Sequence, residues 1–155
     1  MSKKSEELVD KLNKFWKEND SDFKNFPRFF RNISKEISQD QIEKDIFSNK
    51  ECYEQEWFKK YSKKDQKDLK NSWDKSLKFK QLLLNEFGEV QVLENERSDD
   101  GDHDQWNLIL KFHKENLILQ ICGYYSSNDG ANFDDPEYYE VKPKEYTVIR
   151  YDIVK

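Results

Sequence analysis

The first 87 residues repeat apolar side chains every three or four positions, which is the spacing of one face of an α-helix. Polar and charged stretches interrupt the repeat. The pattern predicts five helices, at residues 5–18, about 27–37, about 39–48, 51–62 and about 65–87. In the third of these, Ile42, Ile46 and Phe47 are expected to face the interior.

Several helix ends carry recognisable signals. Ser5 is placed to cap the first helix, and Pro27 suits the first turn of the second. Ser38 followed by Gln41 has the form of a capping box, in which the two side chains satisfy free backbone N–H groups. Gly88 follows the last helical residue, where a glycine commonly ends a helix.

From residue 90 the hydrophobic period changes from 3.6 to two, which is typical of half-buried strands. The strands are expected at 90–92, 106–113, 117–125, 138–142 and 147–153. Helices followed by an antiparallel meander make an α+β fold, here with about five helices packed on four to five strands. Residues 1–87 form the helical region and 88–155 the sheet region, and 155 residues fit one compact unit.

The two regions differ in charge. Residues 1–87 contain 20 Lys and Arg against 17 Asp and Glu, whereas residues 88–155 contain 7 against 15. The second half is therefore strongly acidic. It suits a basic partner and would repel the phosphates of a nucleic acid.

Acidic residues concentrate in two of the expected strand connections. In a meander, successive connections alternate between the two ends of the sheet, so 97–105 and 126–137 emerge at the same end. Together they carry eight carboxylates: Asp99, Asp100, Asp102, Asp104, Asp129, Asp134, Asp135 and Glu137. We expect one composite acidic edge there, with Arg97 as the fixed cation among the acids.

Four tyrosines flank the second acidic stretch, namely Tyr124, Tyr125, Tyr138 and Tyr139. Tyrosine offers a large contact area at low entropic cost, so exposed tyrosines beside carboxylates are typical of protein interfaces. The tyrosines and the acidic edge together predict a surface that binds a protein.

Metal binding is weakly indicated. The run 99–104 resembles a calcium loop, but its glycine comes too early and no glutamate follows at the required distance. The histidines and cysteines, His103, His113, Cys52 and Cys122, match no common zinc spacing. We expect no metal and no cofactor, and two buried thiols.

Catalytic signatures are equally sparse. Glu140-Val141-Lys142 has the Glu-x-Lys form of metal-dependent nucleases, with Asp129 or Asp134 as a further ligand. The motif is short in a chain rich in both residues. Four glycines form no phosphate-binding loop, and two histidines leave few carriers for acid–base chemistry. We expect no catalytic residue, with the nuclease kept as an alternative.

A DNA-binding function would rest on residues 33–42, which have the pattern of two short helices with a polar joint. A recognition helix brings Arg, Lys, Asn or Gln to the major groove. The second helix here, with Glu43 and Asp45, is acidic instead. An ordinary helical core is the favoured interpretation, with a DNA-binding regulator as the alternative.

Residues 88–151 resemble a C-terminal module of small phage and mobile-element proteins of Gram-positive bacteria. The resemblance is carried by the Gly/Asp-rich run 99–104, by Tyr124-Tyr125-Ser126-Ser127 with Gly130, and by Glu140-Val141-Lys142-Pro143 with Glu145, Val148 and Tyr151. It covers somewhat under half of the chain. It implies a setting and no activity.

In general character the chain is also similar to type II-A anti-CRISPR proteins, which are small, acidic and rich in Lys and Asn. That likeness implies a protein that binds the Cas9 nuclease and blocks DNA binding or cleavage. Cas9 holds its heteroduplex in a positively charged channel, which an acidic surface could occupy. Alternatively, the acidic surface could dock on the HNH domain.

We therefore expect a non-enzymatic inhibitor of a host-defence nuclease, most specifically Cas9, acting in the cytoplasm of a bacterial host without direct contact to nucleic acid or membrane. An immunity protein that neutralises a toxic nuclease is the main alternative. The expected partner-binding residues are Asp99, Asp100, Asp102, Asp104, Tyr124, Tyr125, Asp129, Asp134, Asp135, Glu137 and Tyr138.

Overall fold

A computed structural model describes residues 1–19, 26–31, 33, 35–97, 105–126, 128 and 130–155. Five helices and five strands follow one another in these residues, and the α+β fold is confirmed. The elements are α1 (Lys3–Asn19), α2 (Phe26–Arg31), β1 (Glu36–Ile37), α3 (Gln39–Tyr53), α4 (Glu56–Lys59), α5 (Lys63–Phe87), β2 (Val90–Arg97), β3 (Gln105–Phe112), β4 (Leu117–Ser126) and β5 (Gly130–Glu140).

The five strands form one antiparallel sheet in sequence order, β1-β2-β3-β4-β5. The short strand β1 was not expected. Glu36 and Ile37 pair with Gln91 and Val90 of β2, and α2 ends at Arg31 rather than near residue 37. The prediction of two adjoining helices across 33–42 is therefore wrong, because edge pairing with β2 overrides the local helical pattern.

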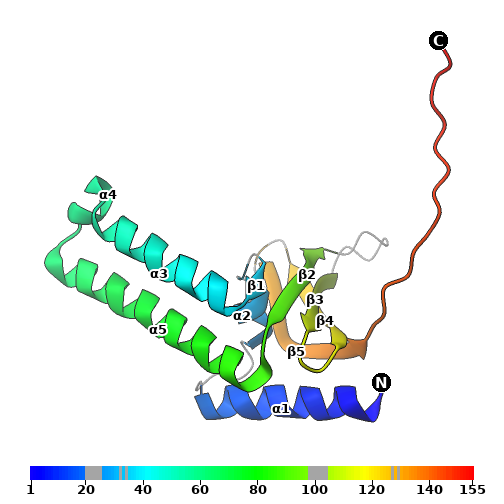
Figure 1. Cartoon of the computed structure of the whole chain (residues 1–155), viewed down its shortest axis with the longest axis horizontal. Coiled ribbons are helices and arrows are strands. Elements are labelled where there is room, and N and C mark those ends of the chain that lie inside the picture. Colours follow the sequence, from blue (N-terminus) through cyan, green and yellow to red (C-terminus); the bar gives the residue numbers. More distant parts are fainter. Residues whose placement is uncertain (20–25, 32, 34, 98–104, 127, 129) are drawn as a thin grey trace.

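The end of the chain also differs from expectation. β5 runs from Gly130 to Glu140 and takes up most of the stretch that was expected to be a loop. Residues 141–155 form neither helix nor strand, so the strand expected at 147–153 is absent from the structure. These C-terminal residues extend away from the body of the protein (Figure 1).

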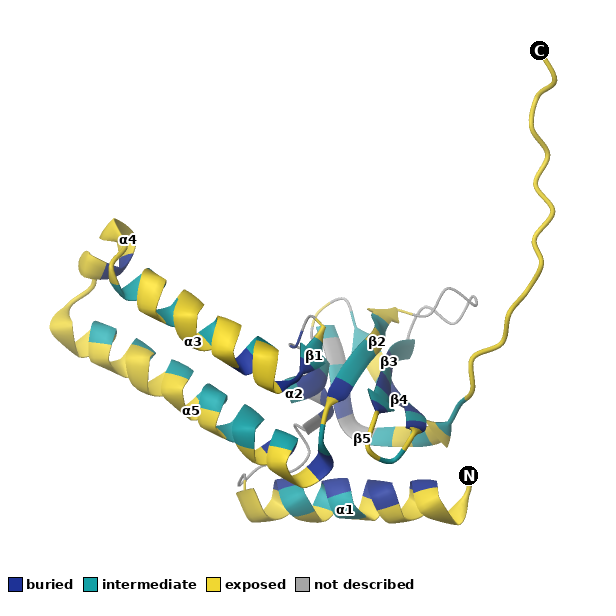
Figure 2. Ribbon diagram, viewed as in Figure 1, coloured by how far each residue is buried: buried dark blue, intermediate teal, exposed yellow. Residues whose placement is uncertain are grey.

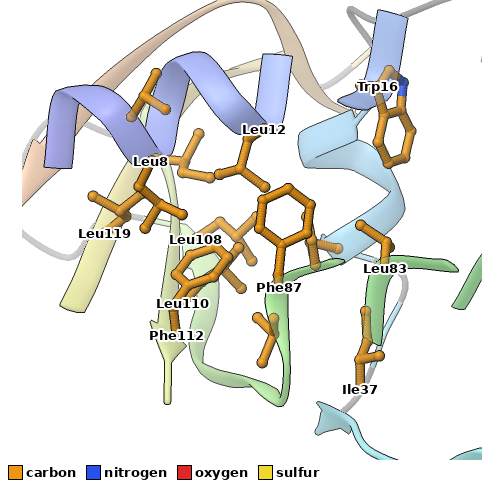
Figure 3. Close-up of a cluster of buried hydrophobic side chains, with 14 of the residues drawn as sticks. Leu8, Leu12, Trp16, Ile37, Leu83, Phe87, Leu108, Leu110, Phe112 and Leu119 are labelled. Carbon is orange, nitrogen blue, oxygen red and sulfur yellow. The ribbon is translucent and has the colours of Figure 1, made fainter. Parts of the chain in front are cut away.

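The hydrophobic core lies on one face of the sheet. Leu108, Leu110 and Phe112 of β3 are fully buried, and the alternate residues of that strand are only half-buried. Helices α1, α2 and α5 cover the buried face (Figure 3). Their contributions to the core are Leu8, Val9, Leu12, Trp16, Phe30, Leu83 and Phe87.

Three aromatic rings join these helices to one another. Phe79 of α5 contacts Trp16 of α1 with ring centroids 4.8 Å apart, and Phe29 of α2 with centroids 5.0 Å apart. Both contacts are edge-to-face, which is a favoured arrangement of aromatic pairs. The chain can thus build a core with few aliphatic residues, because each ring buries a large area.

α3 and α5 lie side by side and project from the sheet, with α4 at the far end (Figure 1). We call α3, α4 and the part of α5 beside them the helical arm. Most of its surface is exposed (Figure 2). Ile42 is buried as expected, but the expectation for Ile46 and Phe47 is wrong, since Phe47 is 65% exposed.

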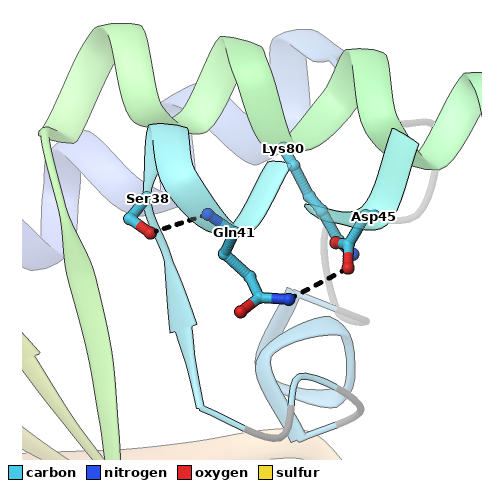
Figure 4. Close-up of polar contacts among 4 residues, drawn as sticks. All are labelled: Ser38, Gln41, Asp45 and Lys80. Carbon is cyan, nitrogen blue, oxygen red and sulfur yellow. Dashed lines mark hydrogen bonds and ion pairs between the residues drawn. The ribbon is translucent and has the colours of Figure 1, made fainter. Parts of the chain in front are cut away.

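Polar contacts fix the base of the arm (Figure 4). The Ser38 hydroxyl accepts a hydrogen bond from the Gln41 N–H at 3.2 Å, so the predicted cap is confirmed in half. The Gln41 side chain does not reach back to Ser38 and donates instead to Asp45 at 3.0 Å. Asp45 also pairs with Lys80 of α5, with 3.1 Å between Nζ and Oδ2.

A small aromatic cluster closes the tip of the arm. Phe58 of α4 is buried, and Tyr53 stacks on Trp73 of α5 with centroids 5.5 Å apart. Trp57 and Tyr61 lie at the same tip and are exposed. None of the helices in the described part of the chain is both long enough and apolar enough to cross a membrane.

Candidate protein interface

The β2–β3 and β4–β5 connections leave the sheet at one end, as the meander predicts, because neighbouring strands are antiparallel. The first is residues 98–104, and it carries four of the predicted binding residues. Asp99, Asp100, Asp102 and Asp104, together with Asp129 in the other connection, lie outside the described residues.

The second acidic stretch is mainly strand and not loop. β4 ends at Ser126 and β5 begins at Gly130, so only three residues join them. Asp134, Asp135 and Glu137 belong to β5, at the edge of the sheet. The acidic edge is therefore arranged differently from expectation: part of it runs along a strand, and only 98–104 and 127–129 occupy the connections.

β5 carries a wide bulge that divides its pairing with β4. Cys122 pairs with Glu137 and Tyr124 pairs with Asn132, so Gly123 alone faces residues 133–136. The bulge turns the Phe133 ring into the core, where it is 2% exposed. A Cβ on Gly123 would lie 2.5 Å from that ring, so the close approach requires glycine.

The four tyrosines divide between the two faces of the sheet because successive strand residues point in opposite directions. Tyr124 and Tyr139 lie on the face away from the core and are 58% and 48% exposed. Tyr125 and Tyr138 lie on the core side and are half-buried, which corrects the expectation that all four are exposed. Burial raises the pKa of Tyr138 well above its ordinary value.

Tyr125 belongs to a ladder of stacked side chains at the connection end of the covered face. The Arg97 guanidinium lies 4.2 Å from the centre of the Tyr125 ring, and that ring stacks on Trp106 at 5.7 Å. Arg31 of α2 lies over the other ring, 4.8 Å from the Trp106 centroid. Arg97 is thus held by an aromatic partner at the acidic edge, and the ladder ties α2 to three strands.

Asn95 completes this tie. Its amide oxygen accepts a hydrogen bond from Trp106 Nε1 at 3.0 Å, and its amide nitrogen donates to the Arg31 carbonyl at 2.5 Å. No sequence pattern indicates this arrangement, because its members come from α2, β2, β3 and β4. The ladder and Asn95 together join α2 to β2, β3 and β4 at the connection end of the sheet.

The outer face of the sheet is the surface that the sequence reading missed. We define it as the side chains pointing away from the core on β2–β5. Cross-strand pairing aligns them in rows. Two neighbouring rows contain the acids: Glu94, Ile109, Gln120 and Tyr139 form one, and Glu96, Asn107, Cys122 and Glu137 form the next. The row on one side of them includes Lys111 and Ile118, and the row on the other side includes Tyr124. The period-two alternation in β3 was the available signal.

Hydrogen bonds hold much of this face in place. Gln120 Nε2 donates to Asn107 Oδ1 at 3.1 Å, and the Tyr139 hydroxyl donates to Glu137 at 2.5 Å. The bond to Glu137, reinforced by its charge, raises the pKa of Tyr139. Burial, reinforced by the same carboxylate, raises the pKa of the Cys122 thiol, so the sulfur stays protonated and is a poor nucleophile.

Glu140 has a structural partner. Its carboxylate accepts hydrogen bonds from the Ser5 hydroxyl at 2.6 Å and from the Ser2 backbone N–H at 2.9 Å. Hydrogen bonding from the Ser2 side chain, the Ser5 side chain and the Ser2 backbone lowers the pKa of Glu140 to about 2. Ser5 is therefore not the cap of α1: it lies inside the helix, and Ser2 accepts from the Ser5 N–H. Glu140 joins the sheet to the start of α1.

Neither metal nor thiol chemistry finds support in this geometry. Among the described residues, no three His, Cys, Asp or Glu side chains gather closely enough to hold a metal ion. Cys52 and Cys122 are free thiols; Cys122 is buried as expected, whereas Cys52 is only half-buried, so the expectation for Cys52 is wrong. What the described part does assemble is an acidic, partly apolar sheet face, and such a surface suits contact with a protein.

Comparison with known proteins adds no relative: no protein-family model, curated protein or solved structure matches this chain.

Proposed function

We propose that this chain is a non-enzymatic inhibitor that binds a basic nuclease through the outer face of its sheet and the adjoining acidic connections. Cas9 is the specific partner proposed, acting in the cytoplasm of a bacterial cell. The observation that carries the proposal is the acidic row at the connection end of the outer face, where Glu96 and Glu137 flank Asn107 and Cys122.

Charge supports this choice of partner. Residues 88–155 carry 15 acidic and 7 basic side chains, and the exposed Glu96 and Glu137 both lie on the outer face. A partner with a basic, nucleic-acid-binding channel would be attracted to such a face. Electrostatic complementarity of this kind mainly raises the association rate and fixes the orientation of docking.

Shape and side-chain chemistry support a protein partner. The outer face presents exposed Tyr124 and Tyr139 next to half-exposed Ile109 and Ile118. Aromatic anchors surrounded by polar groups are the usual centre of a binding interface. The hydrogen bond from Tyr139 to Glu137 fixes the ring beforehand, so less side-chain entropy is lost on binding.

The direct test is a pull-down from a lysate that contains Cas9, with and without guide RNA, followed by a DNA-cleavage assay. We expect capture of Cas9 and loss of cleavage. Capture that requires empty Cas9 would place the chain in the nucleic-acid channel. Capture of guide-loaded Cas9 with DNA binding intact would place it on the HNH domain. Absence of both capture and inhibition would refute Cas9 as the partner.

Charge reversal tests the surface separately from the partner. Glu96→Lys with Glu137→Lys changes the outer face, and Asp134→Lys with Asp135→Lys changes the acids of β5. Either pair is expected to slow association and to weaken its salt dependence. Glu51→Lys with Glu54→Lys is the matched control, because both residues are exposed and lie at the end of α3. Equal loss in the control would reject the outer face as the binding surface.

The immunity-protein alternative shares this surface. It is separated by the nuclease that the chain inhibits: protection against a toxic nuclease, with Cas9 unaffected, would favour immunity.

A further inference from the structure

Residues 146–154, which we call the tail, have the composition and alternation of a β-strand but no strand partner. The sequence Tyr-Thr-Val-Ile-Arg-Tyr-Asp-Ile-Val is rich in β-branched and aromatic residues, which favour strands. Thr147, Ile149, Tyr151 and Ile153 fall on one side of such a strand. In the structure the tail is neither helix nor strand.

The tail exposes large apolar side chains along its length. Tyr151 is 91% exposed and Ile153 is 89% exposed. Six of its side chains are large, hydrophobic and solvent-accessible: Tyr146, Val148, Ile149, Tyr151, Ile153 and Val154. A contiguous exposed apolar segment of this kind marks an interaction site.

The same chain also offers an open sheet edge. β5 is the last strand of the sheet, and no strand in the described part of the chain lies on its other side. From Glu137 to Glu140 its pairing with β4 is regular, and the Val141 N–H continues it by donating to the Ile118 carbonyl. The bulge at 133–136, with Pro136, bounds this regular stretch at one end. Five residues are a typical strand length.

The residues that flank the tail are basic, whereas β5 is acidic. β5 contains Asp134, Asp135, Glu137 and Glu140 and no Lys or Arg. Within the tail Arg150 and Asp152 balance, and the surplus of basic side chains lies beside it at Lys142, Lys144 and Lys155. A tail strand lying along β5 would therefore add no net negative charge to that acidic edge.

The connection between β5 and the tail argues for pairing with another molecule. To reach its own β5, the tail would have to turn back within residues 142–145. Pro143 restricts the residue before it to extended conformations. The chain that follows β5 leads away from the sheet (Figure 1). The chain thus contains a segment with strand-forming sequence and an open sheet edge, and the two are not paired with each other.

We propose that the tail of each chain adds as a strand to the regular edge of β5 in a second copy, forming a symmetric, strand-exchanged dimer. Two copies related by a twofold axis would make the same contact twice, which closes the assembly. Tyr138 and Tyr139 flank the pairing edge on its two faces and provide apolar area for the side chains of the incoming strand. This proposal does not depend on the nuclease-inhibitor function.

The test is the molar mass of the intact chain over a concentration series, measured by light scattering or sedimentation. We expect twice the chain mass of 18.9 kDa at high concentration, falling to the chain mass on dilution. Ile149→Pro removes a backbone N–H from the middle of the tail strand and should abolish the dimer. Lys155→Pro is the matched control and should leave the dimer intact.

Both variants should fold, because the tail is exposed along its length and contributes no residue to the core.

Hydrogen exchange identifies the strand with which the tail pairs. Protection of amides in 147–153 that disappears on dilution supports exchange between copies. Protected tail amides in a monomer would mean that the tail folds back on its own β5. A monomer with unprotected tail amides, or an Ile149→Pro variant that remains dimeric, overturns the proposal equally.

Discussion

The sheet region and the helical arm are built from similarly charge-rich sequence, yet they bury their apolar side chains in different ways. The sheet region shares one continuous core with α1, α2 and the end of α5, which pack on one face of its strands. The arm relies on the contact between α3 and α5, on Asp45 with Lys80, and on a separate aromatic cluster at its tip. The comparison shows that a helix can be long and still bury few of its side chains.

We expect the sheet core to unfold as one cooperative unit and the tip of the arm to unfold locally. Each core residue of the sheet region touches neighbours that are distant in sequence, so its loss is felt throughout the fold. Residues of the arm tip contact mainly their own hairpin, so their loss can remain local. The variants below are ordered from the largest expected effect to the smallest.

Phe112→Ala and Phe58→Ala compare the two clusters directly, since both rings are fully buried. Phe112→Ala should cost about 3–5 kcal/mol of global stability, because it leaves a cavity in the shared core. Phe58→Ala should speed hydrogen exchange at the tip of the arm and leave the sheet amides unchanged. Phe47→Ala, at an exposed ring, is the control. Equal acceleration across the sheet in Phe58→Ala would show that arm and sheet unfold together.

Gly123→Ala tests the bulge that defines the sheet edge. The new methyl group would meet the Phe133 ring, and overpacking of this kind costs about 1–3 kcal/mol. Gly130→Ala is the companion variant: its Cβ meets nothing within 4 Å, but its φ of +71° costs a side chain about 1 kcal/mol. Urea unfolding compares the two. A Gly123→Ala midpoint at or above that of Gly130→Ala would contradict the tight packing of Phe133.

Ser38→Ala removes the cap at the base of the arm. The loss should be about 1 kcal/mol, because the Gln41 N–H loses its acceptor at a buried position. Ser48→Ala, at an exposed site within α3, is the matched control and should be neutral or slightly stabilising. Thermal unfolding measures both. Equal melting temperatures of the two variants would show that the Ser38 cap does not stabilise the arm.

Glu140→Gln tests the link between the sheet and α1 through its pH dependence. The folded pKa of about 2 lies below the ordinary value of 4.5, so the carboxylate stabilises the fold fully above the ordinary value. That contribution is lost as the pH falls through the folded value. Glu140→Gln should therefore flatten the decline of stability between about pH 5 and pH 2.

Denaturant unfolding at several pH values in this range measures that slope. Glu137→Gln is the control for removing one carboxylate from the same strand. If Glu140→Gln leaves the slope as steep as in the parent chain, the hydrogen bonds from Ser2 and Ser5 do not persist in solution.

Local chemistry was sufficient to predict several features of the fold. Ser38 caps α3 and Gly88 ends α5 because caps depend on residues a few positions away. The strands β3 and β4 follow from their period-two alternation. By contrast, β1 consists of two residues inside a helical pattern, and its pairing with β2 could only be found in three dimensions.

The candidate interface was predicted in part. The sequence correctly places the β2–β3 and β4–β5 connections at one end of the sheet, because that depends only on strand order. It assigned Asp134 and Asp135 to a loop, because Pro136 and the acids resemble turn residues and the bulge was unrecognised. It also treated Tyr125 and Tyr138 as exposed, whereas strand geometry turns them toward the core.

By itself, the sequence determined the α+β order, the start of α3, the end of α5 and the acidic character of the second half, since these depend on local spacing and composition. Only the tertiary structure decided that α3 and α5 leave the core as an arm and that the tail lies apart from the sheet. It also decided which side of each strand is covered. The physical reason is that the hydrophobic period determines which side chains share a face, whereas tertiary packing determines which element covers that face.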